Sequence, residues 1–246
     1  MKATKHLLLA TAIAVAIADA AAAQSVTVSL AVRETASGAA IFDNGGTSGG
    51  IEWIDKDANV VPLDGAWHQV SFNLPTAAVD AFAGGTANGD LEVADGTIEH
   101  IRILNSDGIT LPIRLYIDDL VHTDVTGAPT TFDWESYAVG DEVMFQEPGF
   151  SGSTAGNLVA GATSGVTDAM AHGGSLSYQA DFQFIDNDPA RWVRWTTFSA
   201  SNAPNPAVKL DSTISFWVKG GVIPEPTSVA LAGLAALGLA VCRRRK

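Results

Sequence analysis

Hydrophobic residues alternate with polar or small ones along most of the chain. Val26, Val28, Leu30 and Val32 show this period of two, which is the pattern of a half-buried β-strand. Similar segments predict further strands at 67–74, 97–104, 111–121, 131–137, 176–185, 191–198 and 212–218. Residues 76–83 are instead a candidate for a short helix. Numerous strands separated by Gly, Asn, Asp and Pro turns, without an internal repeat, predict an antiparallel β-sandwich of jelly-roll type.

The predicted strands fall into two halves, 25–124 and 131–218, which do not resemble each other. Residues 115–121 (LYIDDLV) resemble the final strand of carbohydrate-binding jelly rolls, and residues 132–137 (FDWESY) resemble the first strand of such folds. The resemblance implies one sandwich in permuted order, in which a turn at 126–129 joins the last strand to the first. Two small, separately folded β domains are the alternative interpretation.

The N-terminal segment has the composition of an export signal. Lys2 and Lys5 precede an apolar stretch and then three alanines, which offer a small-residue cleavage site. We therefore predict a secretory signal peptide at 1–23 and a sandwich at 24–221 that folds outside the cytoplasm.

The C-terminal segment combines three features in a fixed order. Pro224, Glu225 and Pro226 form an extended stretch, because each proline fixes φ and lacks a backbone donor. An uncharged apolar run follows, and then four cations: Arg243, Arg244, Arg245 and Lys246. As a helix this run is about 21 Å long, short of the roughly 30 Å hydrocarbon core, but flanking arginines can snorkel. We predict a transmembrane helix at 228–242, with the cations as a cytoplasmic membrane stop.

This order of Pro-Glu-Pro, apolar helix and basic cluster resembles the PEP-CTERM sorting tail of exported bacterial proteins. The resemblance covers 222–246, with Ile223 where valine usually precedes the first proline. It implies that an exosortase, a membrane-embedded sorting enzyme, cuts near the Pro-Glu-Pro motif. It also implies a precursor anchored in the inner membrane and a product at the cell surface or in the extracellular matrix of a biofilm-forming bacterium. Such tails occur on unrelated bodies and carry no body function across.

The predicted outer portion is strongly acidic. Omitting Lys2, Lys5 and the four terminal cations reduces the basic residues from 14 to eight, and omitting Asp19 and Glu225 reduces the acidic residues from 27 to 25. The resulting net charge of −17 disfavours nucleic acid and anionic lipid as partners. The one cysteine, Cys242, lies in the tail, so the predicted sandwich must fold without a disulfide.

Acidic residues beside the 126–129 turn are a candidate metal site. If the strands on either side of the turn are neighbours, Asp118, Asp119, Asp133 and Glu135 converge. Carboxylate oxygens suit Ca²⁺, and the resemblance to carbohydrate-binding jelly rolls also implies a structural calcium there. Separately solvated acidic residues are the alternative. No cofactor is predicted to be required.

Tryptophans supply a candidate ligand site. On the strand at 191–198, Trp192 and Arg194 lie on one face, while Val193 and Trp195 lie on the other. Trp53 follows a glycine-rich loop. Trp53 and Trp192 are therefore candidates for stacking on a sugar. The alternative is that all the tryptophans fill the core or cap its rim.

The sequence contains no convincing catalytic motif. A G-x-S-x-G match at 46–50 lies in a glycine-rich loop and not between a strand and a helix, as the nucleophile elbow requires. We predict a non-enzymatic, exported protein associated with extracellular polysaccharide. A purely structural surface protein is one alternative. An extracellular polysaccharide hydrolase, which would need a carboxylate pair in a cleft, is another.

Overall fold

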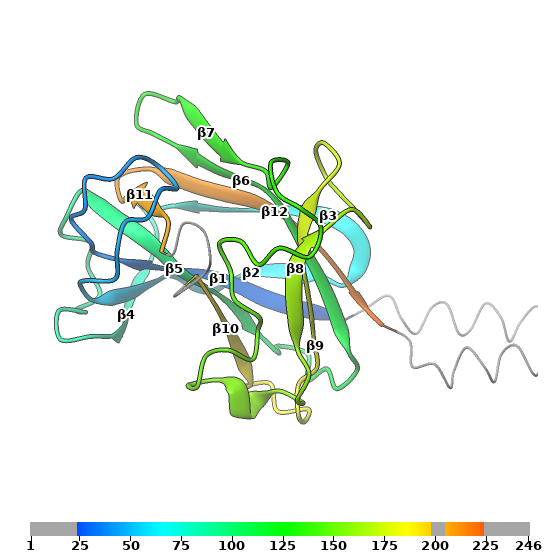
Figure 1. Ribbon diagram of the computed structural model, residues 1–246. Helices are drawn as coiled ribbons and strands as arrows, with labels where there is room; N and C mark the ends of the chain where they lie inside the picture. The colour runs from blue at the N-terminus through cyan, green and yellow to red at the C-terminus, as the bar shows by residue number, and fades with distance from the viewer. Residues whose placement is uncertain (1–23, 198–204, 224–246) are drawn as a thin grey trace, which may run out of the picture.

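The computed structural model describes residues 24–197 and 205–223 (Figure 1). Four predictions lie outside these residues: the signal peptide, the Pro-Glu-Pro motif, the transmembrane helix and the terminal cations. Within the two described ranges, no helix is long and apolar enough to cross a membrane.

Two antiparallel sheets make up the fold, which confirms the predicted β-sandwich. The first sheet has the order β10-β5-β1-β2-β4, with β11 also paired to β5. Its strands are β1 (Ser25–Arg33), β2 (Ile51–Pro62), β4 (Val79–Ala83), β5 (Asp95–Leu104), β10 (Trp192–Thr196) and β11 (Ala207–Lys209). The jelly-roll type and the permuted order stay predictions.

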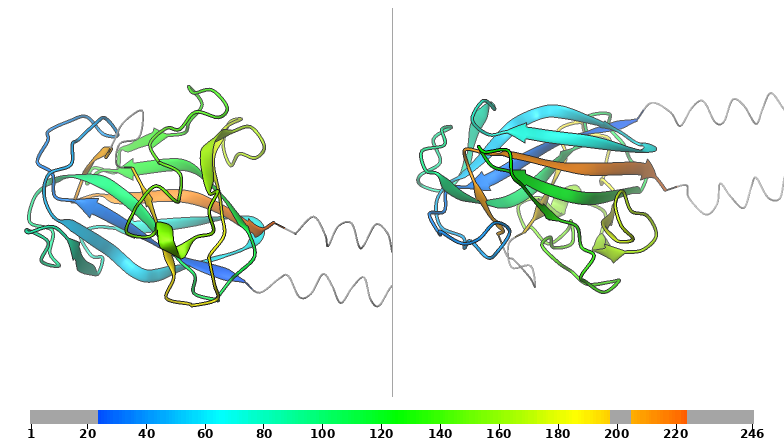
Figure 2. Two further views of the ribbon diagram at one scale, coloured as in Figure 1. Left: turned by 60° about the horizontal axis from the view of Figure 1, so that its bottom comes forward. Right: turned by 90° about the horizontal axis from the view of Figure 1, so that it is seen from above.

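The second sheet has the order β3-β12-β6-β9-β8, with β7 also paired to β6. Its strands are β3 (Asp64–Asn73), β6 (Ile113–Thr123), β7 (Pro129–Phe132), β8 (Thr163–Thr167), β9 (Ser177–Phe182) and β12 (Thr213–Val222). A 3₁₀ turn, η1 (Ala155–Asn157), precedes β8. The start of β1 and the end of β12 lie at the same end of the sandwich (Figure 2).

One cluster of buried apolar side chains fills the core. Val193 and Trp195 of β10 both belong to it, as the alternation of that strand predicts. The Trp195 ring lies 5.1 Å from that of Phe145 and 5.8 Å from that of Tyr178, between centroids. Its indole N–H donates to the backbone oxygen of Gln146 at 2.9 Å, so the polar atom of this buried ring is satisfied.

Each sheet contains strands from both halves of the sequence. In the first sheet, β10 and β11 pair with β5, and Trp195 lies opposite Ile101. In the second sheet, β12 lies between β3 and β6. The strands on either side of the 126–129 turn are neighbours, as predicted, because Leu120 of β6 pairs with Phe132 of β7.

Two local predictions are wrong. Residues 79–83 of the expected helix form edge strand β4, in which Val79 pairs with Ile54 of β2. Branched and aromatic side chains favour an extended edge that packs on a neighbouring strand over an isolated turn of helix. The strand expected at 131–137 ends at Phe132.

Strand β1 is more deeply buried than its alternation predicts. Ser29 and Ala31, which point away from the core, have the same exposure as core-facing Leu30, namely 0%. The outer side of a sandwich sheet normally faces water. Other side chains must therefore cover the outer face of the first sheet, where "outer" means the side turned away from the second sheet.

Candidate functional site

Four rings from four strands cover the outer face of the first sheet, and we call them the outer aromatic cluster: Trp53 (β2), Phe82 (β4), His100 (β5) and Trp192 (β10). Trp53 stacks on Phe82, with 4.3 Å between centroids and 22° between planes. Trp192 meets Trp53 edge-on at 5.6 Å and 88°. Because β1 lies between β2 and β5, the rings meet across β1, where the small Ala31 side chain leaves them room.

The structure thus brings together the two tryptophans that the sequence indicated for ligand binding. Trp53 and Trp192 are both half-buried. Phe82 covers one face of Trp53, so a ligand can contact only the part of the cluster that stays exposed. Sugar binding by these residues stays a prediction.

The remaining tryptophans divide between the core and the opposite face. Trp134 and Trp195 are fully buried in the core, as the alternative interpretation expected for all of them. Trp67 and Trp217 are half-buried on the second sheet, where His172 stacks on Trp217 at 4.0 Å and 14°. The molecule therefore has aromatic groups on two faces.

A chain of hydrogen bonds fixes the outer aromatic cluster from below. The Trp53 indole Nε1–H donates to Nε2 of His100 at 2.9 Å, so this nitrogen carries no proton. Nδ1 of His100 must then carry the proton, and it donates to the Glu99 carboxylate. Burial lowers the pKa of His100, in agreement with a neutral ring.

Glu99 owes its position to a β-bulge in β5. Ala31 pairs with His100 and Val32 with Ile98, which leaves Glu99 as the extra residue. Sequence alternation alone did not single out Glu99 or His100. The spacing did contain a signal, since buried Ile98 and Ile101 are three residues apart where a regular strand has two.

Two arginines hold the buried Glu99 carboxylate. Arg194 donates from Nε to Oε2 at 3.2 Å and from Nη2 to Oε1, and Arg33 donates from Nη2 to Oε1 at 3.5 Å. Burial alone would raise the pKa of Glu99, but the hydrogen bonds from His100 and Arg194 and the charge of Arg194 lower it to about 2. Glu99 is therefore ionised at neutral pH.

Further cations lie over the rings. The Lys56 ammonium is 4.8 Å from the centroid of Trp53, and the Arg102 guanidinium is 5.3 Å from that of Trp53 and 5.4 Å from that of Trp192. The Arg194 guanidinium is 5.5 Å from the centroid of Phe82. These distances are within the range of cation–π attraction. The outer aromatic cluster is thus interleaved with positive charge.

A pocket of about 310 Å³ opens beside the cluster, and we call it the arginine pocket. Its lining residues are Arg33, Glu99, Phe150, Ser151, Gly152, Arg194 and Thr196. The loop that closes it is tied to β10, because the Arg194 backbone N–H donates to Oγ1 of Thr154 at 3.1 Å. Arg194 contacts both this pocket and Phe82, so the two features form one continuous surface.

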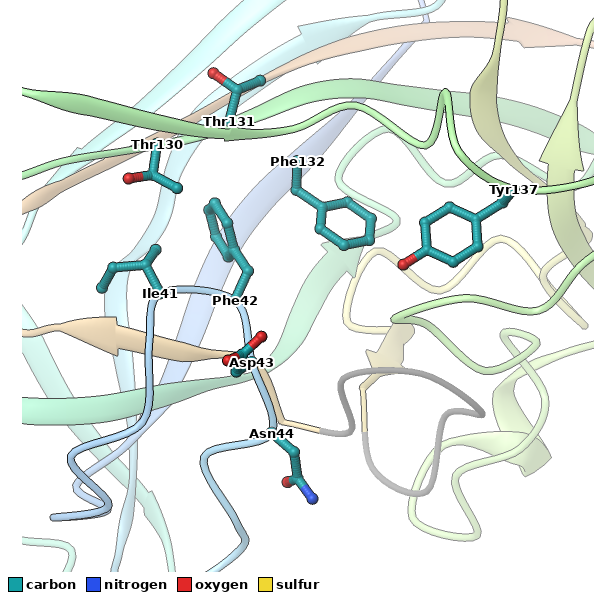
Figure 3. A pocket seen from close by; sticks show the side chains of 8 residues that line it. All are labelled: Ile41, Phe42, Asp43, Asn44, Thr130, Thr131, Phe132 and Tyr137. Atoms are coloured by element: carbon teal, nitrogen blue, oxygen red, sulfur yellow. The ribbon is translucent and has the colours of Figure 1, made fainter.

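A second pocket, of about 320 Å³, lies between the 41–44 segment and β7 (Figure 3). Figure 3 shows the rings of Phe42, Phe132 and Tyr137 side by side there; Phe132 lies 6.0 Å from Phe42 and 5.8 Å from Tyr137 between centroids. Its lining contains neither Lys nor Arg, and Phe132 packs edge-on against the core residue Trp134. We therefore place the candidate site at the first sheet.

Three of the carboxylates predicted to bind calcium contact one loop. Asp118 accepts backbone N–H groups from His172 at 2.7 Å and Gly173 at 3.1 Å, and Asp119 contacts the His172 ring at 2.7 Å. Burial raises the pKa of Asp118, and these backbone hydrogen bonds oppose the rise. The Asp118 carboxylate thus binds the loop by accepting hydrogen bonds from its backbone N–H groups.

Glu135 meets the same loop. Its Oε1 accepts the backbone N–H groups of Ser175 and Leu176, each at 2.7 Å, whereas Asp133 accepts the N–H of Glu135 at 3.2 Å. A Cβ at Gly174, where φ is +59°, would lie 2.2 Å from Glu135 Oε1, so the contact requires glycine. The described residues contain no group of three or more His, Cys, Asp or Glu that could hold a metal ion. Calcium binding stays a prediction.

Residues 222–246 match the model of the PEP-CTERM protein-sorting motif. The chain carries a PEP-CTERM sorting signal. This confirms the resemblance drawn from Pro224, Glu225 and Pro226 and the basic cluster that follows the apolar run. The protein is therefore an exported exosortase substrate that is processed at the membrane. No curated protein and no solved structure matches the chain.

Proposed function

We propose that the body of this exported protein is a non-enzymatic polysaccharide-binding module, which associates the sorted product with extracellular polysaccharide. The observation that carries the proposal is the outer aromatic cluster with its interleaved cations. The C–H faces of sugars pack on aromatic rings, and their hydroxyl groups hydrogen-bond to charged side chains. Both kinds of group lie together on the outer face of the first sheet.

The hydrogen-bond chain below the cluster supports a binding role. Trp53 is held by His100, His100 by Glu99, and Glu99 by Arg194. Side chains that are fixed before binding lose little conformational entropy when a ligand arrives. A preorganised cluster of this kind suits recognition of a flexible polymer.

The same residues argue against a hydrolase. Glycosidases use a pair of carboxyl groups, one of which must carry a proton to act as general acid. Glu99 is the one carboxylate among the residues that line the arginine pocket, and its pKa of about 2 keeps it unprotonated. A single carboxylate that stays ionised supports the proposed role in binding.

Replacing Trp53 or Trp192 by alanine is expected to weaken polysaccharide binding about tenfold each. Loss of a central aromatic contact in a binding surface costs between 1 and 2 kcal/mol or more, and about 1.4 kcal/mol corresponds to tenfold in affinity. The full-length chain in detergent would be screened against a panel of neutral and acidic polysaccharides. The dissociation constant of the best binder would then be compared between the wild type and the variants.

Trp217→Ala is the matched control, since it removes a half-buried ring from the opposite face. It is expected to leave the dissociation constant unchanged, and thermal melting would verify that each variant is folded. A folded wild-type protein that binds no member of the panel would favour the purely structural surface protein. Loss of binding in Trp217→Ala alone would move the site to the second sheet.

A further inference from the structure

The arginine pocket points to the charge of the ligand. We propose that the polysaccharide bound at the outer aromatic cluster carries carboxylate groups, as uronic acid residues do, and that Arg33 and Arg194 bind one of these carboxylates. This inference rests on the proposed function and adds to it the chemical class of the sugar.

The distribution of positive charge is the first argument. Residues 24–222 contain eight basic side chains against 25 acidic ones. Four of the eight lie at the outer aromatic cluster or in the arginine pocket: Arg33, Lys56, Arg102 and Arg194. Their partners among the acidic side chains at this surface are Glu99 and Asp57. A neutral sugar does not require such a concentration of scarce cations, whereas an anionic one does.

Unused hydrogen-bond donors are the second argument. A guanidinium has five N–H groups. Arg194 donates to Glu99 from Nε and Nη2, and its Nη1 makes no hydrogen bond within the residues described. Arg33 donates from Nη1 to the backbone oxygens of Thr47 and Gly49, at 3.2 and 3.4 Å, and its Nε is buried, so only its two NH₂ groups can offer a further N–H to a ligand. The Glu99 carboxylate therefore leaves N–H groups of the two arginines for a carboxylate of the ligand. Guanidinium groups bind carboxylates with a planar fork.

The third argument concerns what Glu99 does to the two arginines. As an ionised carboxylate it orients both guanidinium groups but neutralises only one of their two charges. The side chains of Arg33 and Arg194 are only 15% and 18% exposed. Much of their hydration is therefore already lost before binding, and a hydrogen bond made in such surroundings is stronger than one made in open water. The pocket is a preformed site with one positive charge in excess.

The net charge of −17 does not prevent an anionic sugar from binding in the arginine pocket. The Debye length is about 8 Å at physiological ionic strength, so distant acidic groups are screened while groups inside the pocket are not. The volume of about 310 Å³ falls at the lower end of the range for small-molecule sites. It suits a single acidic sugar residue, with the rest of the polymer lying over the rings.

The test compares acidic polymers with neutral polymers of the same backbone. The full-length chain in detergent would be titrated with alginate and polygalacturonate, and with both polymers after chemical reduction of their carboxyl groups. The dissociation constant for the acidic forms is expected to be at least tenfold lower than that for the reduced forms. Dextran sulfate is expected to bind more tightly than the reduced forms, because it is charged, but less tightly than the uronate forms, because the site is assigned to planar carboxylates.

Variants assign the effect to the pocket. Arg33→Gln and Arg194→Gln are each expected to remove most of the preference for the acidic forms, measured as the ratio of the dissociation constants for the reduced and acidic forms. Arg114→Gln is the matched control, since Arg114 pairs with Asp181 on the second sheet. If Arg194→Gln fails to fold, the comparison of polymers on the wild-type protein still decides the matter.

The possible failures are distinguishable. Equal binding of acidic and reduced polymers would overturn the inference and leave the proposed function intact. Equal binding of dextran sulfate and the uronate polymers would overturn the assignment to carboxylates. Binding to none of these polymers, or to any on the wider panel, would overturn the proposed function and the inference with it.

Discussion

Residues 24–125, expressed without the rest of the chain, are expected to remain unfolded. In the complete fold, β12 is the hydrogen-bonded neighbour of β3 and also pairs with β6, while β10 and β11 pair with β5. The N-terminal half alone would leave β3 without a partner strand and the core side of both sheets open to water. A fragment with so much exposed apolar surface cannot offset its conformational entropy.

Far-ultraviolet circular dichroism and urea titration would test this expectation. The fragment should show no cooperative unfolding transition, whereas residues 24–223 should unfold in a single one. A fragment with dispersed amide resonances and its own transition would instead establish the alternative of two separately folded β domains.

Glu99→Gln is expected to destabilise the protein by about 3 kcal/mol, because removing one partner of a buried ion pair leaves the other charges uncompensated. Glu99 is 0% exposed, and its loss would leave Arg194, Arg33 and His100 without their shared acceptor charge. The pKa gives a similar figure by a separate route. A fall from 4.5 to about 2 corresponds to roughly 3 to 4 kcal/mol at about 1.4 kcal/mol per pKa unit.

The pH dependence identifies the cause of the loss. Because folding lowers the pKa of Glu99, its contribution is complete above pH 4.5 and is lost as pH falls toward about 2. The difference in free energy of unfolding between the wild type and Glu99→Gln, measured by urea titration, should therefore be largest near neutral pH and shrink below 4.5. Glu92→Gln, at an exposed position, is the control and should change stability by less than about 0.5 kcal/mol. A difference that stays constant down to pH 2 would show that Glu99 acts by packing and not by charge.

The fold was predictable for those strands in which apolar and polar residues alternate regularly. The alternation in β1, β3 and β12 reflects a core face that must be apolar, and this constraint acts within each strand. Strand β2 was not predicted, because Asp55 and Asp57 interrupt its alternation. Both residues have positive φ, of 47° and 63°, which bends the strand without ending it.

The site was predictable only in part, because it depends on the order of strands in the sheet. Trp53 and Trp192 could each be singled out from the sequence, yet nothing local indicates that β2 and β10 bring them together across β1. Glu99 and His100 depend on a bulge whose position is fixed by pairing with β1. The sorting motif was predictable from the sequence, because its order of Pro-Glu-Pro, apolar run and cations is contiguous in the chain.

The most direct test of the central claim is the response of the tryptophan indole N–H resonances of residues 24–223 to an added uronate oligosaccharide. The tryptophans divide evenly, since Trp53 and Trp192 lie on the first sheet, Trp67 and Trp217 on the second, and the other two in the core. Binding at the outer aromatic cluster should shift the signals of Trp53 and Trp192 and leave the other four in place. Shifts confined to Trp67 and Trp217, or no shift at saturating ligand, would contradict it.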